Sequence, residues 1–221
     1  MVLTPTGTLD MATYQALRTE MVKVASDEPR AVLVDVRNLD VSMTSALALF
    51  PAVAGELTNW LGLPLLLIDA DDRLPPGYRM RRWVPVHRSL AAAVAGIGDP
   101  PPRQVATRRL PNSAMAPRLG REFVRTCCRR WAIDEQRAGD ALLIANELIE
   151  NTVMHTFYPA VIRMALRRDK LTVAVSDLDP AQPPVVPPDD ALRGMTVVHK
   201  LSRAWGVAPS TSGGKVVWAC L

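Results

Sequence analysis

Glu147 and Asn151 are the two side chains of this sequence that are best spaced for chemistry. They lie in a stretch from Asp134 to His155 that contains no proline and is rich in Ala and Leu, which predicts a helix. At 3.6 residues per turn, the small packing side chains share one stripe, namely Ala138, Ala141, Ala145, Ile149 and Thr152, and the two polar residues face the other way. An asparagine carbonyl can ligate Mg²⁺ beside substrate phosphates, and a glutamate one turn earlier can orient or deprotonate a nucleophile. The alternative is a surface helix with ordinary polar residues.

The other elements of the C-terminal half are expected to hold this helix against a sheet. A helix from Pro117 to Trp131 has apolar residues at intervals of four. Alternating strands at 159–167 and 171–176 suit a hairpin with its turn at 168–170. The remaining segments are a strand at 104–110, a helix at 191–204 and a final strand at 216–221. Helices on one face of a mixed sheet predict an α/β sandwich.

The segment Glu147-Leu148-Ile149-Glu150-Asn151-Thr152-Val153-Met154-His155 resembles the N-box of the GHKL ATPase/kinase superfamily, in its anti-sigma-factor kinase branch. The similarity covers residues 105–221 and implies the Bergerat α/β sandwich of that family. It also implies ATP and Mg²⁺ as cofactors. In this interpretation Glu147 is the catalytic base or water orienter, and Asn151 binds the nucleotide through the metal ion.

Two further segments occupy the places of the family's glycine boxes. Ser176-Asp177-Leu178-Asp179-Pro180 stands where the first box stands, which implies that Asp177 accepts a hydrogen bond from the adenine amino group. The segment 191–198 stands where a glycine turn normally wraps the phosphates, which implies that Gly194 lines them and that Arg193 pairs with one. Both boxes depart from the family pattern, since Asp179 replaces a glycine and the second box keeps a single glycine.

The N-terminal half alternates between strands and helices, which predicts a small α/β domain. Asp10 is placed to cap a helix at 11–26, and a hydroxyl-rich loop at 38–47 feeds a second helix at 44–60. A buried strand is expected at 31–36, a second strand at 64–69 and a short one at 84–87, followed by a helix at 89–96 that Gly96 stops.

This half resembles a STAS domain, the fold of anti-sigma-factor antagonists, in three segments: Gly7-Thr8-Leu9-Asp10, Val34-Asp35-Val36 and Met43-Thr44-Ser45-Ala46-Leu47. The last segment corresponds to the family's phosphorylation site, which implies Thr44 as phospho-acceptor, with Ser45 beside it. A phosphate at a helix N-terminus meets free N–H groups and the positive end of the helix dipole. The usual Asp and Gly of this site are Met43 and Ala46 here. The alternative is that Thr44 only caps the helix.

The bulk properties fit two domains of a protein without a membrane segment. The sequence predicts a STAS-like domain over 1–98, a proline-rich linker over 99–104 and a GHKL-like domain over 105–221. The formal charge is +4, and the arginines lack interleaved aromatic residues, so nucleic-acid binding gains no support and an acidic protein partner explains them as well. Three cysteines, two of them adjacent, form no disulfide framework. Without a signal peptide or an apolar span, a cytoplasmic location is expected.

Two hypotheses for the function therefore stand side by side. In the first, the protein is a partner-switching regulator of sigma factors in which an ATP-dependent serine/threonine kinase domain is linked to a STAS-like domain. In the second, it is a catalytically inactive scaffold that binds sigma or anti-sigma factors without phosphotransfer. The partners in either case are sigma factors, anti-sigma factors or their antagonists. Members of the family commonly pair as homodimers, although no exposed apolar seam in the sequence requires it.

Overall fold

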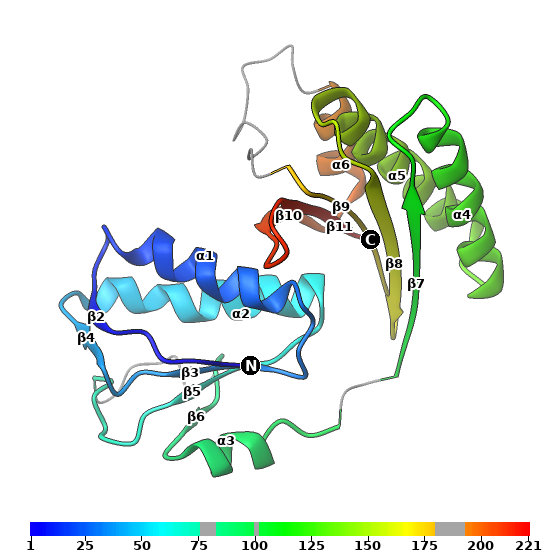
Figure 1. Ribbon diagram of the computed structural model, residues 1–221. Coiled ribbons are helices and arrows are strands. Elements are labelled where there is room, and N and C mark those ends of the chain that lie inside the picture. The colour runs from blue at the N-terminus through cyan, green and yellow to red at the C-terminus, as the bar shows by residue number, and fades with distance from the viewer. Residues whose placement is uncertain (76–82, 100–101, 180–192) are drawn as a thin grey trace. The chain divides into compact units, whose positions relative to one another are not determined.

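The computed structural model describes residues 1–75, 83–99, 102–179 and 193–221. The chain forms two compact units, Met1–Pro100 and Pro101–Leu221, and each contains its own sheet and its own helices (Figure 1). The expected α/β fold class is therefore confirmed.

The main sheet of the first unit is parallel throughout the described residues. Its strand order is β1 (Val2–Leu3), β3 (Val32–Asp35), β5 (Leu65–Ile68) and β6 (Val86–His87). Every residue of β3 and β5 is buried. Helices α1 (Tyr14–Ala25) and α2 (Leu49–Trp60) cover one face of this sheet, and α3 (Leu90–Ala95) packs on the other (Figure 1). Continuous apolar runs such as β3 are typical of parallel strands covered on both faces.

The first helix begins later than the sequence indicates. The Asp10 carboxylate accepts hydrogen bonds from the backbone N–H groups of Ala12, at 2.8 Å, and Thr13, at 2.9 Å. These bonds close a turn ahead of the helix, because a short carboxylate that binds nearby backbone competes with helical hydrogen bonding. The expected start at residue 11 is therefore wrong, and α1 begins at Tyr14.

The segment expected as a loop feeding one long helix has more structure than predicted. Residues Leu39–Val41 form β4, which pairs in parallel with β2 (Gly7–Leu9). The following residues form a 3₁₀ helix, η1 (Thr44–Ala48), and the α-helix begins only at Leu49. Pro51 explains the break, because a proline lacks an N–H and its ring clashes with the carbonyl four residues earlier, so it fits only in the first turn.

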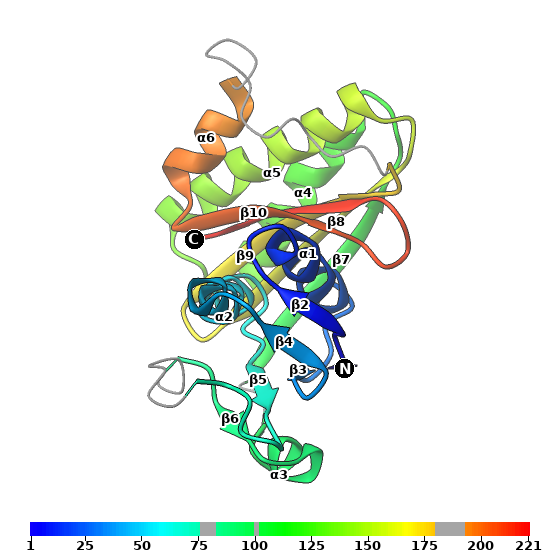
Figure 2. The same ribbon diagram turned by 90° about the vertical axis from the view of Figure 1, so that its left-hand side faces the viewer.

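The sheet of the second unit is antiparallel across its described strands, which corrects the expected mixed sheet. Its strand order is β10 (Ala204–Pro209), β11 (Lys215–Cys220), β9 (Lys170–Asp177), β8 (Ala160–Arg167) and β7 (Arg103–Leu110). Helices α4 (Ala116–Arg130), α5 (Glu135–His155) and α6 (Arg193–Leu201) cover one face of this sheet (Figures 1 and 2). Alternate residues of the strands point into the core beneath these helices, for example Ile162, Val173 and Val217.

The β8–β9 hairpin is confirmed, and the end of the last helix is corrected. Arg167 pairs with Lys170, and the turn between them contains Arg168 with a φ of 53°. The helix expected to reach residue 204 ends at Leu201, while residues 191 and 192 lie outside the described part of the chain. It stops because Ala204 is already paired with Cys220 in the sheet.

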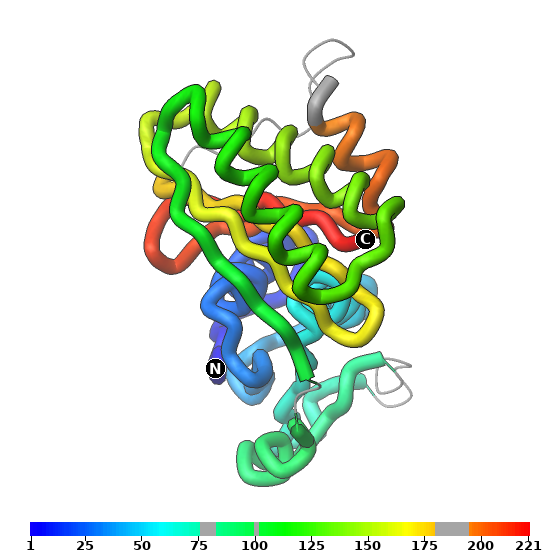
Figure 3. The backbone as a smooth tube through the Cα atoms, turned by 90° about the vertical axis from the view of Figure 1, so that its right-hand side faces the viewer, coloured from blue at the N-terminus to red at the C-terminus, as the bar shows by residue number. Residues whose placement is uncertain are grey.

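Helix α5, which carries Glu147 and Asn151, is fixed by its cap and by its packing. The Asp134 side chain accepts a hydrogen bond from the Arg137 N–H at 2.9 Å, so it is the N-cap of the helix. Helix α4 lies alongside α5 (Figure 3). Gly120 allows this close approach, since a Cβ there would overlap Ile149 Cδ1. The small-residue stripe predicted for α5 is confirmed as its packing face, because Ala141, Ala145, Ile149 and Thr152 are buried there.

Candidate functional site

Glu147 and Asn151 lie one turn apart on α5, and both are half-buried. Their side of the helix is not part of the core cluster, and Met154 farther along it is exposed. An acid and a carboxamide therefore project from the same side of a rigid helix, as the spacing predicts. Helix α5 packs against β9, the strand that ends at Asp177.

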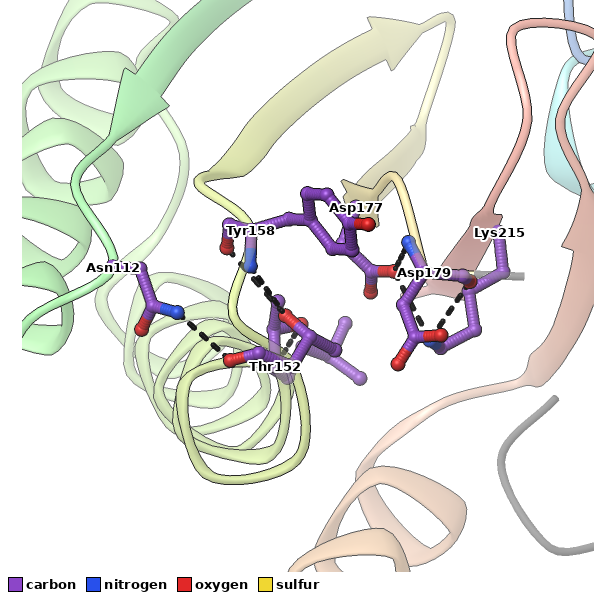
Figure 4. A network of polar contacts seen from close by, with 8 residues as sticks. Asn112, Thr152, Tyr158, Asp177, Asp179 and Lys215 are labelled. Carbon is purple, nitrogen blue, oxygen red and sulfur yellow. Dashed lines mark hydrogen bonds and ion pairs between the residues drawn. The ribbon is translucent and has the colours of Figure 1, made fainter. Parts of the chain in front are cut away.

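Asp177 is buried and forms an ion pair with Lys215. Its Oδ1 atom accepts a hydrogen bond from Lys215 Nζ at 3.0 Å and another from the Asp179 N–H at 2.9 Å (Figure 4). Lys215 is the first residue of β11 and stands directly opposite Asp177 in the β9–β11 ladder. The side chains of Asp177 and Lys215 are 1% and 10% exposed, respectively, so the two opposite charges neutralise each other away from water.

The backbone around this pair is also tightly fixed. The Lys215 ammonium group donates a second hydrogen bond to the Asp179 carbonyl at 3.3 Å. Gly214 precedes Lys215 with a φ of +80°, a left-handed conformation that favours glycine. A Cβ at this position would overlap the Asp177 carbonyl oxygen and would lie 2.6 Å from Leu178 Cα. Glycine therefore lets the β10–β11 turn approach the end of β9 closely enough to form the pair.

A second polar network holds the C-terminal end of α5. The Asn112 side chain donates to the Thr156 carbonyl at 2.8 Å, and the Tyr158 N–H donates to the Thr156 hydroxyl at 3.4 Å (Figure 4). Thr152, whose hydroxyl donates to the Leu148 carbonyl at 3.0 Å, is buried in the same region. These bonds fix the last turn of the helix and hence the backbone position of Asn151.

The two ends of this site differ in how well they suit a nucleotide. Glu147 and Asn151 present the side-chain types that a hydrated Mg²⁺ and a phosphate-bearing ligand require. At the other end, an adenine amino group needs a carboxylate oxygen that can accept its hydrogen bond, but Oδ1 of Asp177 already binds the Lys215 ammonium group. Among the described residues, no three His, Cys, Asp or Glu side chains gather as a metal site. The oxygen Oδ1 of Asp177, which the resemblance assigns to adenine, is therefore already bound within the protein.

The structure leaves the phosphate-binding predictions open. Helix α6 begins at Arg193, but the side chain of this residue and Gly194 lie outside the described side chains. Residues 180–192, which include most of the proline-rich loop, lie outside the described part of the chain as well. The roles of Arg193 and Gly194 remain predictions.

The candidate phospho-acceptors belong to the first unit. Thr44 and Ser45 are exposed at the start of η1. The N-cap of η1 is Met43, which has an extended backbone, and no side chain caps this helix. The alternative in which Thr44 serves as a helix cap is therefore wrong, and both hydroxyl groups lie at the surface.

The cysteines of α4 are part of the core. Cys127 and Cys128 are buried, and their thiols are free. Burial raises the pKa of the Cys127 thiol and raises the pKa of Cys128 to about 11. Both thiols therefore stay protonated near neutral pH and act as small apolar side chains, as the sequence indicates.

Sequence reasoning missed Lys215, which forms the buried ion pair with Asp177. The sequence pattern places this residue beside a closing strand and no more, and its partner lies 38 residues earlier in the chain. One signal was present: a lysine at the start of an apolar strand, directly after two glycines, is a charge that must find a buried partner or leave the sheet. The identity of that partner depends on strand register, which the sequence does not display.

No protein-family model matches the sequence, and no curated protein matches it either. Among solved structures, the chain is similar to a crystal structure of the RsbU and RsbW domains of Rv1364c from Mycobacterium tuberculosis, with 20% sequence identity and a TM-score of 0.41. The match covers 55% of this chain and 32% of that chain, so it spans about a third of that protein's length. Among the helices of the described residues, none has the length and apolar character needed to cross a membrane.

Proposed function

We propose that the protein is a regulator in a sigma-factor partner-switching system and that its second unit acts as a kinase-like scaffold without phosphotransfer. The ion pair between Asp177 and Lys215 carries this proposal, because it holds the carboxylate that would otherwise recognise adenine. The loss of glycines in both glycine boxes supports the same interpretation. Its partners are sigma factors, anti-sigma factors or their antagonists.

The surface of the second unit supports a protein partner. Residues 101–221 contain seventeen Lys and Arg against eleven Asp and Glu, so this unit favours an acidic partner. Large apolar side chains are exposed near the C-terminal end of α5, including Met154 and Phe157, the latter being 97% exposed. Exposed apolar groups of this kind are typical of protein-binding surfaces.

A second candidate function is an ATP-dependent protein kinase of the anti-sigma type. The arrangement of Glu147 and Asn151 on one side of α5 favours it, since this is the pair that the resemblance assigns to the base and the metal. In that case the phospho-acceptor is Thr44 or Ser45, or a hydroxyl group of a separate STAS protein.

Binding with and without nucleotide separates the two candidates. The full chain is immobilised and exposed to the sigma factors and STAS proteins of the source organism, with and without Mg·ATP. A scaffold binds one of them with the same Kd in both conditions. Mass spectrometry of the mixtures then shows no added phosphate on Thr44, on Ser45 or on the partner.

Two results contradict the scaffold and favour the kinase. One is partner binding that requires Mg·ATP. The other is phosphate on a Ser or Thr that disappears when Glu147 is changed to Gln.

A further inference from the structure

We propose that the Lys215 side chain fills the place at the end of β9 where an adenine base would bind Asp177. We further propose that removal of this side chain opens the place to adenine. The inference rests on the proposed function, because it takes the second unit to be a nucleotide-binding fold that has lost its ligand. The inference attributes the loss of nucleotide binding to the Lys215 side chain.

The contact itself gives the first argument. Lys215 Nζ donates to Asp177 Oδ1 at 3.0 Å, and an adenine amino group would have to donate to the same carboxylate. Both donors would bind the same carboxylate at the end of β9, whose Oδ1 also accepts the Asp179 N–H. The stem of the lysine also takes up space beside the carboxylate, since the side chain is only 10% exposed.

The register of the sheet gives the second argument. Asp177 and Lys215 are directly opposite in the β9–β11 ladder, and Gly214 presses the backbone of the turn against Asp177 and Leu178. The ammonium group is therefore aimed by two strands rather than by a mobile loop. A lysine held in this way remains in place whether or not a nucleotide is present.

The energetics of burial give the third argument. A carboxylate that is 1% exposed is strongly destabilised when its charged partner is removed. A new donor that reaches Asp177 relieves this cost, which favours binding of a ligand with an amino group. In Lys215→Thr, the shorter side chain vacates the space beside Asp177 and leaves the Asp177 carboxylate without its charged partner.

The test compares adenosine with purine riboside, which is the same nucleoside without the amino group. Calorimetric titrations use the full-length wild type, Lys215→Thr and the double variant Asp177→Asn/Lys215→Thr. We expect Lys215→Thr to bind adenosine at least tenfold more tightly than the wild type. We also expect this gain to be absent with purine riboside and in the double variant.

A folded Lys215→Thr variant that binds adenosine no better than the wild type overturns the inference, and if the wild type still binds no Mg·ATP, the proposed function stands. Wild-type binding of Mg·ATP also overturns the inference, whereas phosphate transferred to Thr44, to Ser45 or to a partner overturns the proposed function. Nitrogen-15 NMR of the wild-type lysine ammonium groups serves as a test that needs no variant. A Lys215 signal that millimolar adenosine leaves unchanged supports the inference, and a signal that adenosine shifts overturns it.

Discussion

Asp35 and Asp177 both end a buried strand, and both carboxylates are paired with a basic side chain, but the two pairs are built differently. Asp35 binds Arg37, two residues later, with Arg37 Nε at 2.9 Å from Oδ2, and the arginine side chain is 52% exposed. Asp177 binds Lys215 from another strand, and both side chains are buried. The first pair is local and joins a carboxylate that is 6% exposed to an arginine that reaches water, whereas the second is long-range and both of its side chains are buried.

This difference determines what each pair can do. A local pair with an exposed arginine exchanges easily with water and contributes little to stability. When a buried pair between two strands separates, each charge stays buried without its partner, and this costs free energy. The Asp35–Arg37 pair therefore stabilises only the end of its own strand. The Asp177–Lys215 pair joins two strands and holds the carboxylate that would otherwise bind a ligand.

The largest effect is expected for Lys215→Met, which leaves the Asp177 carboxylate buried and unpaired. We expect a loss of about 3–5 kcal/mol in the free energy of unfolding, measured by urea titration. Lys200→Met, at an exposed lysine of α6, is the matched control and should change stability by less than about 0.5 kcal/mol. If Lys215→Met lost as little stability as Lys200→Met, the Asp177–Lys215 pair would not differ from the Asp35–Arg37 pair in the way proposed.

The next effect concerns the backbone that brings Lys215 to Asp177. Gly213 and Gly214 have φ values of +86° and +80°, but only Gly214 has atoms within 4 Å of the place that a Cβ would occupy. We expect Gly213→Ala to cost about 1–2 kcal/mol from backbone strain. Gly214→Ala should cost roughly 1–3 kcal/mol more, because its methyl group meets the backbone of residues 177 and 178. Thermal unfolding of both variants measures the gap, and equal losses would show that the turn does not press on β9.

A smaller, pH-dependent effect is expected for Asp35→Asn. The hydrogen bond from the Arg37 side chain holds the pKa of the Asp35 carboxyl below its ordinary value of 3.8. Its stabilising contribution is therefore present above that value and is lost as the pH falls through the lowered pKa. Urea midpoints should show Asp35→Asn less stable than the wild type by about 1 kcal/mol near neutral pH. The gap should close in strong acid, and a gap that widens there would contradict the assignment.

The smallest effect is expected for Arg37→Ala. Because the arginine side chain is half-exposed, its loss should lower the urea midpoint only slightly at low ionic strength. Salt at about 1 M should remove most of the difference from the wild type. The same salt series on Lys215→Met should leave its loss unchanged, since that pair is buried, and a parallel response of the two variants would argue against the comparison.

The sequence predicts the helix of the site well because its signals are local. The proline-free run from Asp134 to His155 and the small-residue stripe from Ala138 to Thr152 define α5 without any knowledge of the rest of the fold. The β8–β9 hairpin is likewise visible from alternation and a two-residue turn. Pro51 could also have indicated the late start of α2, since a proline belongs to a first helical turn.

The parts that sequence reasoning missed depend on pairing between distant segments. Strand β4 exists because Leu39–Val41 pairs with Gly7–Leu9, and Leu39–Val41 shows no strand pattern by itself. The antiparallel order of the second sheet and the partner of Lys215 both follow from register between β9 and β11. A shift of one residue would send Lys215 to the opposite face, so no local signal could have identified its contact.

Calorimetric titration of the full-length wild type with Mg·ATP tests the central claim most directly. The claim is that the ion pair between Asp177 and Lys215 keeps nucleotide out of the second unit. The account predicts no saturable heat of binding. A saturable one-to-one binding curve that disappears in Asn151→Ala would contradict it.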